Sequence, residues 1–167
     1  KDTRALINTA NQFKTDLSIV KSVVKSNNKR KILLTKRLEN ILNNKLKNKV
    51  ITFLGVTFKP NTDDMREASS IPMIKYLNKN NSKIRYHDPS GEKNEFKKLK
   101  NVKYYKDIQS ACFNSDLIVL HTEWNDFRLL NFKKLVKKSN FKIFDMRNMY
   151  SPSKMKNLKI KYFGIGR

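Results

Sequence analysis

"FLGVTFKPNTDDMRE", residues 53–67, is the stretch that decides the fold. An apolar run ends there at a single glycine, Gly55, and a lysine, two aspartates, an arginine and a glutamate follow closely. The residues just before the loop, "KVITFLG" at 49–55, form a short apolar run with β-branched members, which is typical of a strand buried on both faces. The stretch therefore predicts a buried strand that opens into a densely charged loop.

Segments with strand and helix character alternate after this first strand. Further strands are expected at 83–89 ("KIRYHDP"), 102–105 ("VKYY"), 116–122 ("DLIVLHT"), 141–147 ("FKIFDMR") and 158–166 ("LKIKYFGIG"). Helices are expected between them, at 69–80, 107–115 and 131–139. Alternation of this kind requires crossover connections, so it predicts a mostly parallel sheet. The predicted fold class is α/β, with a Rossmann-like, doubly wound sheet over residues 47–167.

Residues 1–46 have a different pattern. They contain neither proline nor glycine, and their apolar residues recur at helical spacing. The span 15–46 is predicted to form one long amphipathic helix with its basic residues exposed. Because a lone helix of that length needs a partner surface, we expect it to pack on another domain or subunit. The predicted division is therefore a helical segment, 1–46, followed by the α/β domain.

The charge balance raises the question of a nucleic acid or an anionic membrane as partner. The chain of 167 residues carries 37 Lys and Arg against 14 Asp and Glu, a formal net charge of +23. The lysines are scattered along the chain rather than gathered on one element, so a solvated lysine-rich surface is the preferred interpretation. No apolar run approaches the ~20 residues that a membrane-spanning helix needs. The sequence therefore disfavours nucleic acid and membrane as partners.

Few residues are suited to redox or metal chemistry. The only cysteine, Cys112, excludes a disulfide framework and a cysteine zinc site within the chain, and its apolar neighbours predict a buried, inert thiol. His87 and His121 lack metal-ligand spacing, so no metal site is expected. The first residues do not resemble a signal peptide, because no apolar segment follows the basic residue. A cytoplasmic protein, or a piece of one, is expected.

Polar clusters follow the predicted strands. They are "KPNTDDMRE", "HDPSG", "HTEWNDF" and "DMRNMY", and in open α/β sheets ligands bind beyond the carboxyl ends of the strands. Lys59, Arg66 and Arg147 there offer cations suited to a phosphate. Asp63 and Asp64 either orient those cations, accept ribose hydroxyls or cap the loop. The alternatives are that these clusters are ordinary polar loops and that Arg147 forms only a surface ion pair.

A dinucleotide fingerprint is missing from the first loop. The pattern G-x-G-x-x-G needs three glycines so that the backbone can approach a pyrophosphate. Gly55 stands alone, and the bulky "VTFK" follows it. This sheet is therefore not expected to hold NAD in the usual crevice.

Four motifs together resemble one family. "FLGVTFKPNTDDMREASS", "HTEWNDF", "FDMRN" and the terminal "GIGR" are similar, in order and spacing, to the UDP-binding domain of the UDP-glucose 6-dehydrogenase family. The resemblance covers essentially the whole chain, and the "TEW" element favours the UDP-glucose branch. It implies an NAD-dependent two-step oxidation of UDP-glucose to UDP-glucuronate, which serves polysaccharide precursor synthesis, by a homodimer that associates through its central helical domain.

The resemblance also implies roles for single residues. Lys59 and Arg147 match family residues that contact the UDP-sugar, and Arg66 matches an arginine that helps hold NAD across the domain cleft. Met146 is a departure, because the family usually has glycine before this arginine, and it leaves the backbone conformation at Arg147 open.

The first residues extend the resemblance. "KDTRAL" is similar to the end of the family's G-x-C-x-P-K-D motif, so that Lys1 and Asp2 would be its last two residues. Asp2 would then be the family's catalytic aspartate. Arg30, or Lys31 beside it, would match an arginine that reaches the UDP-sugar of the neighbouring subunit.

The motif's cysteine and the glycine fingerprint do not occur within the 167 residues. Without a nucleophilic thiol and a cofactor domain, the chain alone is expected to be inactive as a dehydrogenase. It would be a fragment of a longer protein or the product of a split reading frame. The alternatives are a non-catalytic nucleotide-sugar-binding or dimerisation module, a dehydrogenase of another nucleotide sugar, and a basic nucleic-acid binder.

Overall fold

A computed structural model describes residues 2–166 of the chain. Lys1 and Arg167, the outer ends of the "KD" and "GIGR" motifs, lie outside the described residues. The chain divides into two compact units, with the boundary between Arg37 and Leu38.

The first unit is helical, but the prediction of one uninterrupted helix over 15–46 is wrong at both ends. Helix α1 spans Asp2–Gln12 and helix α2 spans Ser18–Ile41, with its last residues in the second unit. Lys14, between them, has a left-handed φ of 52°. After α2 the chain turns through three asparagines with left-handed φ values of 54°, 58° and 62°: Asn43, Asn44 and Asn48. Asparagine tolerates the left-handed conformation, and a residue in that conformation commonly follows the end of a helix.

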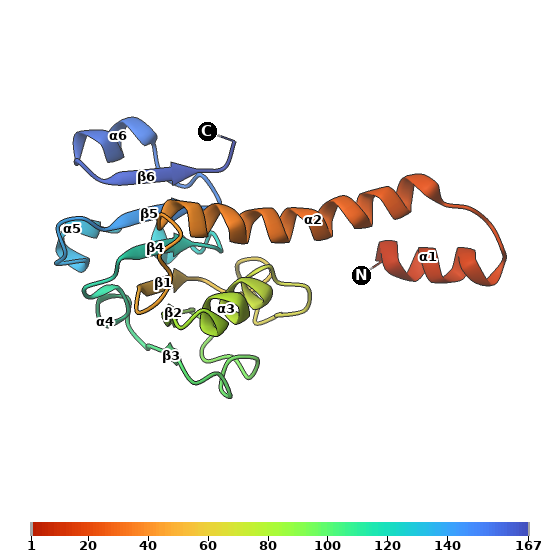
Figure 1. The fold of residues 1–167 in the computed structure, drawn as a ribbon, viewed down its shortest axis with the longest axis horizontal. Helices are drawn as coiled ribbons and strands as arrows, with labels where there is room; N and C mark the ends of the chain where they lie inside the picture. The colour runs from red at the N-terminus through yellow and green to blue at the C-terminus, as the bar shows by residue number, and fades with distance from the viewer. Residues whose placement is uncertain (1, 167) are drawn as a thin grey trace. The chain divides into compact units, whose positions relative to one another are not determined.

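The second unit confirms the predicted fold class. Its described residues form a six-stranded sheet in the order β3-β2-β1-β4-β5-β6, with every neighbouring pair parallel. This is the strand order of Rossmann sheets, and Figure 1 shows the strands side by side. The strands are β1 (Val50–Leu54), β2 (Lys83–His87), β3 (Val102–Tyr104), β4 (Leu117–Leu120), β5 (Lys142–Asp145) and β6 (Lys161–Gly164).

Short helices connect the strands. They are α3 (Ser70–Lys79), α4 (Ile108–Cys112), the 3-10 turn η1 (Asn125–Phe127), α5 (Phe132–Leu135) and α6 (Pro152–Asn157). The sequence did not predict α6, although Pro152 at its first turn is a common helix start. Strands β4 and β5 end two residues earlier than predicted, at Leu120 and Asp145, and the polar residues that follow them form loops.

The core lies where the central strands meet the short helices. One cluster of buried residues joins β1, β4, β5, α4 and α5, and includes Leu54, Ile118, Ile143 and Cys112. Cys112 is fully buried, as the sequence predicts. Trp124 packs partly buried against this cluster, so it has a packing role.

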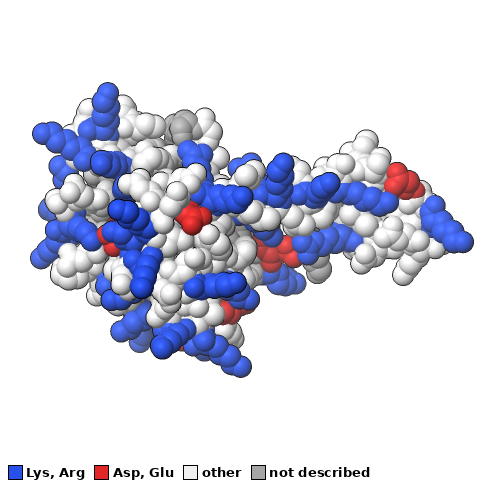
Figure 2. All heavy atoms as spheres, viewed as in Figure 1, with Lys and Arg blue, Asp and Glu red and all other residues white. Residues whose placement is uncertain are grey.

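Lysine and arginine spread over both units rather than over one element (Figure 2). None of the helices within residues 2–166 combines the length and the hydropathy that a bilayer-spanning segment requires.

Candidate anion-binding site

The carboxyl ends of β1, β4 and β5 place three loops on one edge of the sheet. Strand β1 lies between β2 and β4, and β4 lies between β1 and β5. The loop that carries Lys59 and Arg66 follows β1, and Arg147 follows β5. Because all these strands are parallel, their loops leave from the same edge.

Gly55 is where the first loop leaves the sheet. Its φ is 75°, and a Cβ atom added to it would lie 2.6 Å from Cβ of Thr122. Its N–H donates to the main-chain oxygen of His87 over 2.9 Å, while Leu54 accepts from the N–H of His121 over 3.0 Å. The backbone thus passes tightly between the ends of β2 and β4, and this close approach explains the single glycine.

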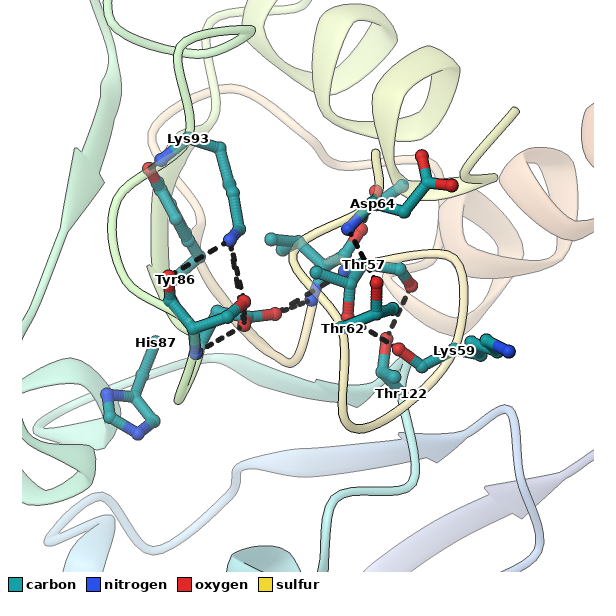
Figure 3. Close-up of polar contacts among 12 residues, drawn as sticks. Thr57, Lys59, Thr62, Asp64, Tyr86, His87, Lys93 and Thr122 are labelled. Carbon is teal, nitrogen blue, oxygen red and sulfur yellow. Dashed lines mark hydrogen bonds and ion pairs between the residues drawn. The ribbon is translucent and has the colours of Figure 1, made fainter. Parts of the chain in front are cut away.

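The loop over residues 56–69 is held by threonine hydroxyls. Thr122 donates from Oγ1 to the main-chain oxygen of Thr57 over 2.8 Å. Thr57 in turn donates from Oγ1 to the main-chain oxygen of Lys59 over 3.1 Å. The side chain of Lys59 is exposed and extends outward from the loop (Figure 3). The end of β4 therefore fixes the backbone that presents this lysine.

Asp64 orients Arg66, which is one of the roles that the sequence left open. The guanidinium donates to the carboxylate at two points, from Nε to Oδ1 over 2.9 Å and from Nη2 to Oδ2 over 2.7 Å. The Arg66 side chain is nevertheless 74% exposed, so it remains accessible from solvent.

His121 is a buried, neutral histidine that joins the first loop to β4. Its Nδ1 lies 3.0 Å from Oγ1 of Thr122, and its Nε2 lies 2.8 Å from Oγ of Ser69. The Thr122 hydroxyl proton goes to Thr57, so Nδ1 of His121 is the donor and Nε2 accepts from Ser69. Burial, and secondarily the charge of Arg147, lowers the pKa of His121 to about 3.

Arg147 is held by groups from the end of β4. Its Nε donates to the main-chain oxygen of His121 over 2.8 Å and lies 2.9 Å from Oε2 of Glu123. The main-chain N–H of Arg147 donates to the carboxylate of the buried Asp145 over 3.0 Å. The guanidinium is thus fixed in direction while its side chain is still 35% exposed.

Met146 does not disturb this arrangement. Its N–H donates to the main-chain oxygen of Leu120 over 3.0 Å, which continues the pairing of β5 with β4. The left-handed position falls later, at Asn148, with a φ of 52°. The departure at Met146 is therefore accommodated without left-handed backbone before Arg147.

A surface depression of about 400 Å³ surrounds Arg147. It opens beyond the ends of β4, β5 and β6. Its described lining consists of Glu123, Arg128, Met146, Arg147, Asn148, Met149 and Ile165. A basic depression of this kind suits an anionic group.

The structure thus brings three of the five candidate residues to one edge. Lys59, Arg66 and Arg147 share that edge, although the depression's described lining includes only Arg147 among them. Asp2 begins α1 and Arg30 lies within α2, and both are exposed in the first unit.

Sequence reasoning assigned no role to Asp88 and Asp145, whose carboxylates accept from the main chain at the start of the Lys59 loop and at Arg147. Both are fully buried; Asp88 directly follows β2, and Asp145 is the last residue of β5. A carboxylate near the end of a predicted strand is the signal in the sequence, but it does not identify the group that the carboxylate binds.

The crevice beyond β1 does not fit a dinucleotide. The N–H groups of Val56 and Thr57, which follow β1, point to the Asp88 carboxylate over 2.7 and 3.4 Å. A pyrophosphate would need such groups itself. Within residues 2–166 no group of three or more His, Cys, Asp and Glu residues is arranged to hold a metal ion.

Comparison with known proteins gives a consistent picture. The family model for the UDP binding domain of the UDP-glucose/GDP-mannose dehydrogenase family matches residues 52–152. The chain is 34% identical to the UDP-glucose 6-dehydrogenase of Rhizobium meliloti, over 100% of this chain and 38% of that protein. It is 36% identical to the UDP-glucose 6-dehydrogenase of Rickettsia typhi, over 99% of this chain and 39% of that protein. The chain thus spans well under half the length of these relatives.

Solved structures share the fold. A UDP-glucose dehydrogenase from Pyrobaculum islandicum superposes with a TM-score of 0.78 at 24% identity, over 98% of this chain and 35% of that one. An NDP-N-acetyl-D-galactosaminuronic acid dehydrogenase from Methanosarcina mazei gives a TM-score of 0.81 at 25% identity, over 100% of this chain and 37% of that one.

Proposed function

This chain belongs to the UDP-glucose/GDP-mannose dehydrogenase family, and from that premise we propose that the sheet edge around Arg147 binds the nucleotide of UDP-glucose. The observation that carries the proposal is the basic depression around Arg147, beyond the ends of β4, β5 and β6. An arginine fixed at Nε presents a planar fork suited to two phosphate oxygens. Lys59 would add a second cation from the neighbouring loop.

The whole protein would be an NAD-dependent UDP-glucose 6-dehydrogenase that forms UDP-glucuronate. In that protein Asp2 would act in catalysis, and Arg30 would reach the UDP-sugar of a neighbouring subunit. Arg66, accessible and oriented by Asp64, would contact NAD held by another domain. The chain's own crevice beyond β1 does not fit that cofactor, so its residues are assigned no step of the hydride transfer. A polypeptide of these 167 residues would bind UDP-glucose without oxidising it.

A dimer through the first unit is part of the proposal. Helices α1 and α2 expose several large apolar side chains, among them Leu6 (50%), Ile19 (79%) and Val23 (55%). Exposed apolar positions of this kind are typical of surfaces that meet a partner. Analytical ultracentrifugation would compare the oligomeric state of the chain with that of a variant in which these three residues are changed to serine. A dimer that the substitutions dissociate would support the proposal, and a monomeric wild-type chain would contradict it.

UDP-glucose is favoured over an N-acetylated sugar by the similarity to named relatives. The UDP-glucose 6-dehydrogenases of Rhizobium meliloti and Rickettsia typhi are 34% and 36% identical to this chain. The "TEW" residues 122–124 support the same choice.

Isothermal titration calorimetry of the chain with UDP and UDP-glucose tests the proposal. Both should bind, and Lys59→Ala and Arg147→Ala should each raise the Kd roughly 10- to 100-fold, the loss expected for a charge-assisted hydrogen bond. Lys133→Ala, which removes an exposed cation from α5, is the matched control and should leave the Kd unchanged. Absence of binding, with salt-sensitive affinity for unrelated DNA instead, would favour the nucleic-acid alternative. NADH production by the purified chain would refute the predicted inactivity.

A further inference from the structure

Asp88 is a buried carboxylate that connects the end of β2 to the start of the Lys59 loop. It follows β2 directly and is 0% exposed. Its Oδ2 accepts from the N–H of Val56 over 2.7 Å and of Thr57 over 3.4 Å, while its Oδ1 accepts from the N–H of Ser90 over 3.0 Å. The two carboxylate oxygens therefore accept from the backbone of two different loops.

Lys93 provides the countercharge inside the protein. It is 4% exposed, and its Nζ lies 4.0 Å from Oδ1 of Asp88 and donates to Oγ of Ser90 over 2.7 Å. Its own N–H donates to the hydroxyl of Tyr86 over 2.8 Å. A buried ion pair loses much of its attraction to desolvation and adds little net stability. The ion pair is therefore better explained by the hydrogen bonds that the Asp88 carboxylate accepts from the two loops than by its own contribution to stability.

The backbone that Asp88 holds leads directly to Lys59. Thr57 receives the hydrogen bond from Thr122 at its main-chain oxygen and donates its hydroxyl to the main-chain oxygen of Lys59. Farther along, Asn61 and Glu67 adopt left-handed φ values of 59° and 61°. A loop with such unfavourable positions keeps one conformation only where its surroundings impose it.

We propose that Asp88, held by Lys93, is the positioning residue that fixes the start of this loop and thereby delivers Lys59 to the phosphates of the nucleotide. The inference rests on the proposed function. The carboxylate occupies the backbone N–H groups that follow β1, where many nucleotide-binding sheets hold a phosphate. The ligand's diphosphate is then left to side-chain cations, Lys59 from the loop after β1 and Arg147 after β5.

A double substitution tests this role without leaving a buried charge unpaired. Asp88→Asn alone would strand Lys93, so the test variant is Asp88→Asn/Lys93→Met, which replaces the ion pair by uncharged groups of similar size. Asparagine has one acceptor oxygen and one donor amide, so it cannot accept from both loops as the carboxylate does. Folding should be retained while the loop loses its anchor.

The first readout is a thermodynamic cycle with UDP in the full chain. The double variant should raise the Kd roughly 10- to 100-fold, as Lys59→Ala does, and adding Lys59→Ala to it should cause no more than about a twofold further loss. Adding Arg147→Ala should multiply the losses. Asp116→Asn, which removes a carboxylate that accepts from the N–H of Val50 at the other edge of the sheet, should leave the Kd unchanged. If the triple variant raises the Kd by the product of the increases caused by the double variant and by Lys59→Ala, the two act independently and the proposal is overturned.

The second readout needs no ligand. Amide hydrogen exchange at Val56, Thr57 and Phe58 should be at least tenfold faster in the double variant than in the wild-type chain and in Asp116→Asn. If the wild-type chain fails to bind UDP, the proposed function fails, and unchanged exchange at these amides would independently overturn the positioning role.

Discussion

Arg147 donates from Nε to the main-chain oxygen of His121 over 2.8 Å, so a guanidinium that follows β5 is tied to the end of β4. The same histidine contacts Ser69 and Thr122, which belong to the start of α3 and to the loop that follows β4. The two candidate phosphate-binding loops are therefore joined through one buried residue rather than placed independently. We therefore expect phosphate binding to depend on the orientation of the Arg147 guanidinium as well as on its charge.

Arg147→Lys is expected to weaken UDP binding almost as much as Arg147→Ala, raising the Kd roughly 10- to 100-fold. Lysine keeps the positive charge but has neither the Nε donor that His121 holds nor a planar fork for two phosphate oxygens. Calorimetric titration with UDP measures the change. Arg85→Lys is the matched control, because Arg85 lies on β2 and donates to the main-chain oxygen of Phe113. A lysine variant with wild-type affinity would show that charge alone is sufficient.

The strand pattern and the cations at the strand ends could be predicted from the sequence, because both depend on local signals. The apolar runs around Phe53, Ile118 and Ile143 are bounded by polar residues, and parallel strands bring their following loops to one edge. The sequence alone therefore places Lys59 and Arg147 at the same edge of the sheet.

The residues that hold the cations could not be predicted in the same way. Asp88 lies 32 positions from Val56 in the sequence, and no periodic pattern links a carboxylate to a backbone N–H at that separation. The helix predicted over 15–46 is shorter at both ends, Ser18–Ile41. Helical periodicity does not reveal the left-handed φ values near its ends, 52° at Lys14 and 54° at Asn43. Both features depend on tertiary structure rather than on local preference.

Gly55→Ala is expected to destabilise the protein more than Gly91→Ala. Both glycines have left-handed φ values, 75° and 92°, but a Cβ at Gly91 would meet nothing within 4 Å, whereas one at Gly55 would lie 2.6 Å from Cβ of Thr122. The conformational cost is about 1–2 kcal/mol at either position, and the overlap should add about 1–3 kcal/mol at Gly55 only. Urea unfolding of the two variants measures the difference. Equal losses would mean that the backbone at Gly55 can move away from β4.

Acid should destabilise the protein through His121. Its pKa is about 3 in the folded state and 6.5 in the unfolded state, so the unfolded state binds more protons between these values. The contribution of the neutral His121 to the free energy of unfolding is complete above pH 6.5 and is lost as the pH falls toward 3. At a pH of about 5 the loss should be about 2 kcal/mol. Denaturant unfolding over this range should show the decline.

His121→Asn should flatten that decline while lowering stability at neutral pH, because asparagine does not titrate and cannot reach Ser69 as the imidazole does. His87→Asn is the matched control and should retain the pH dependence, since His121 is unchanged. A His121→Asn variant with the full acid sensitivity of the wild-type chain would assign the effect to other groups.

Cys112 should be unreactive toward thiol reagents in the folded protein. It is fully buried in the core cluster, and burial raises the pKa of its thiol to about 12, so almost no thiolate exists at neutral pH. Ellman's reagent should therefore label the chain only as fast as the core opens, and immediately in concentrated guanidinium chloride. The double variant of Asp88 and Lys93 should label slowly as well, because that substitution frees a loop and leaves the core closed. Rapid labelling of the folded wild-type chain would show that α4, which carries Cys112, opens without global unfolding.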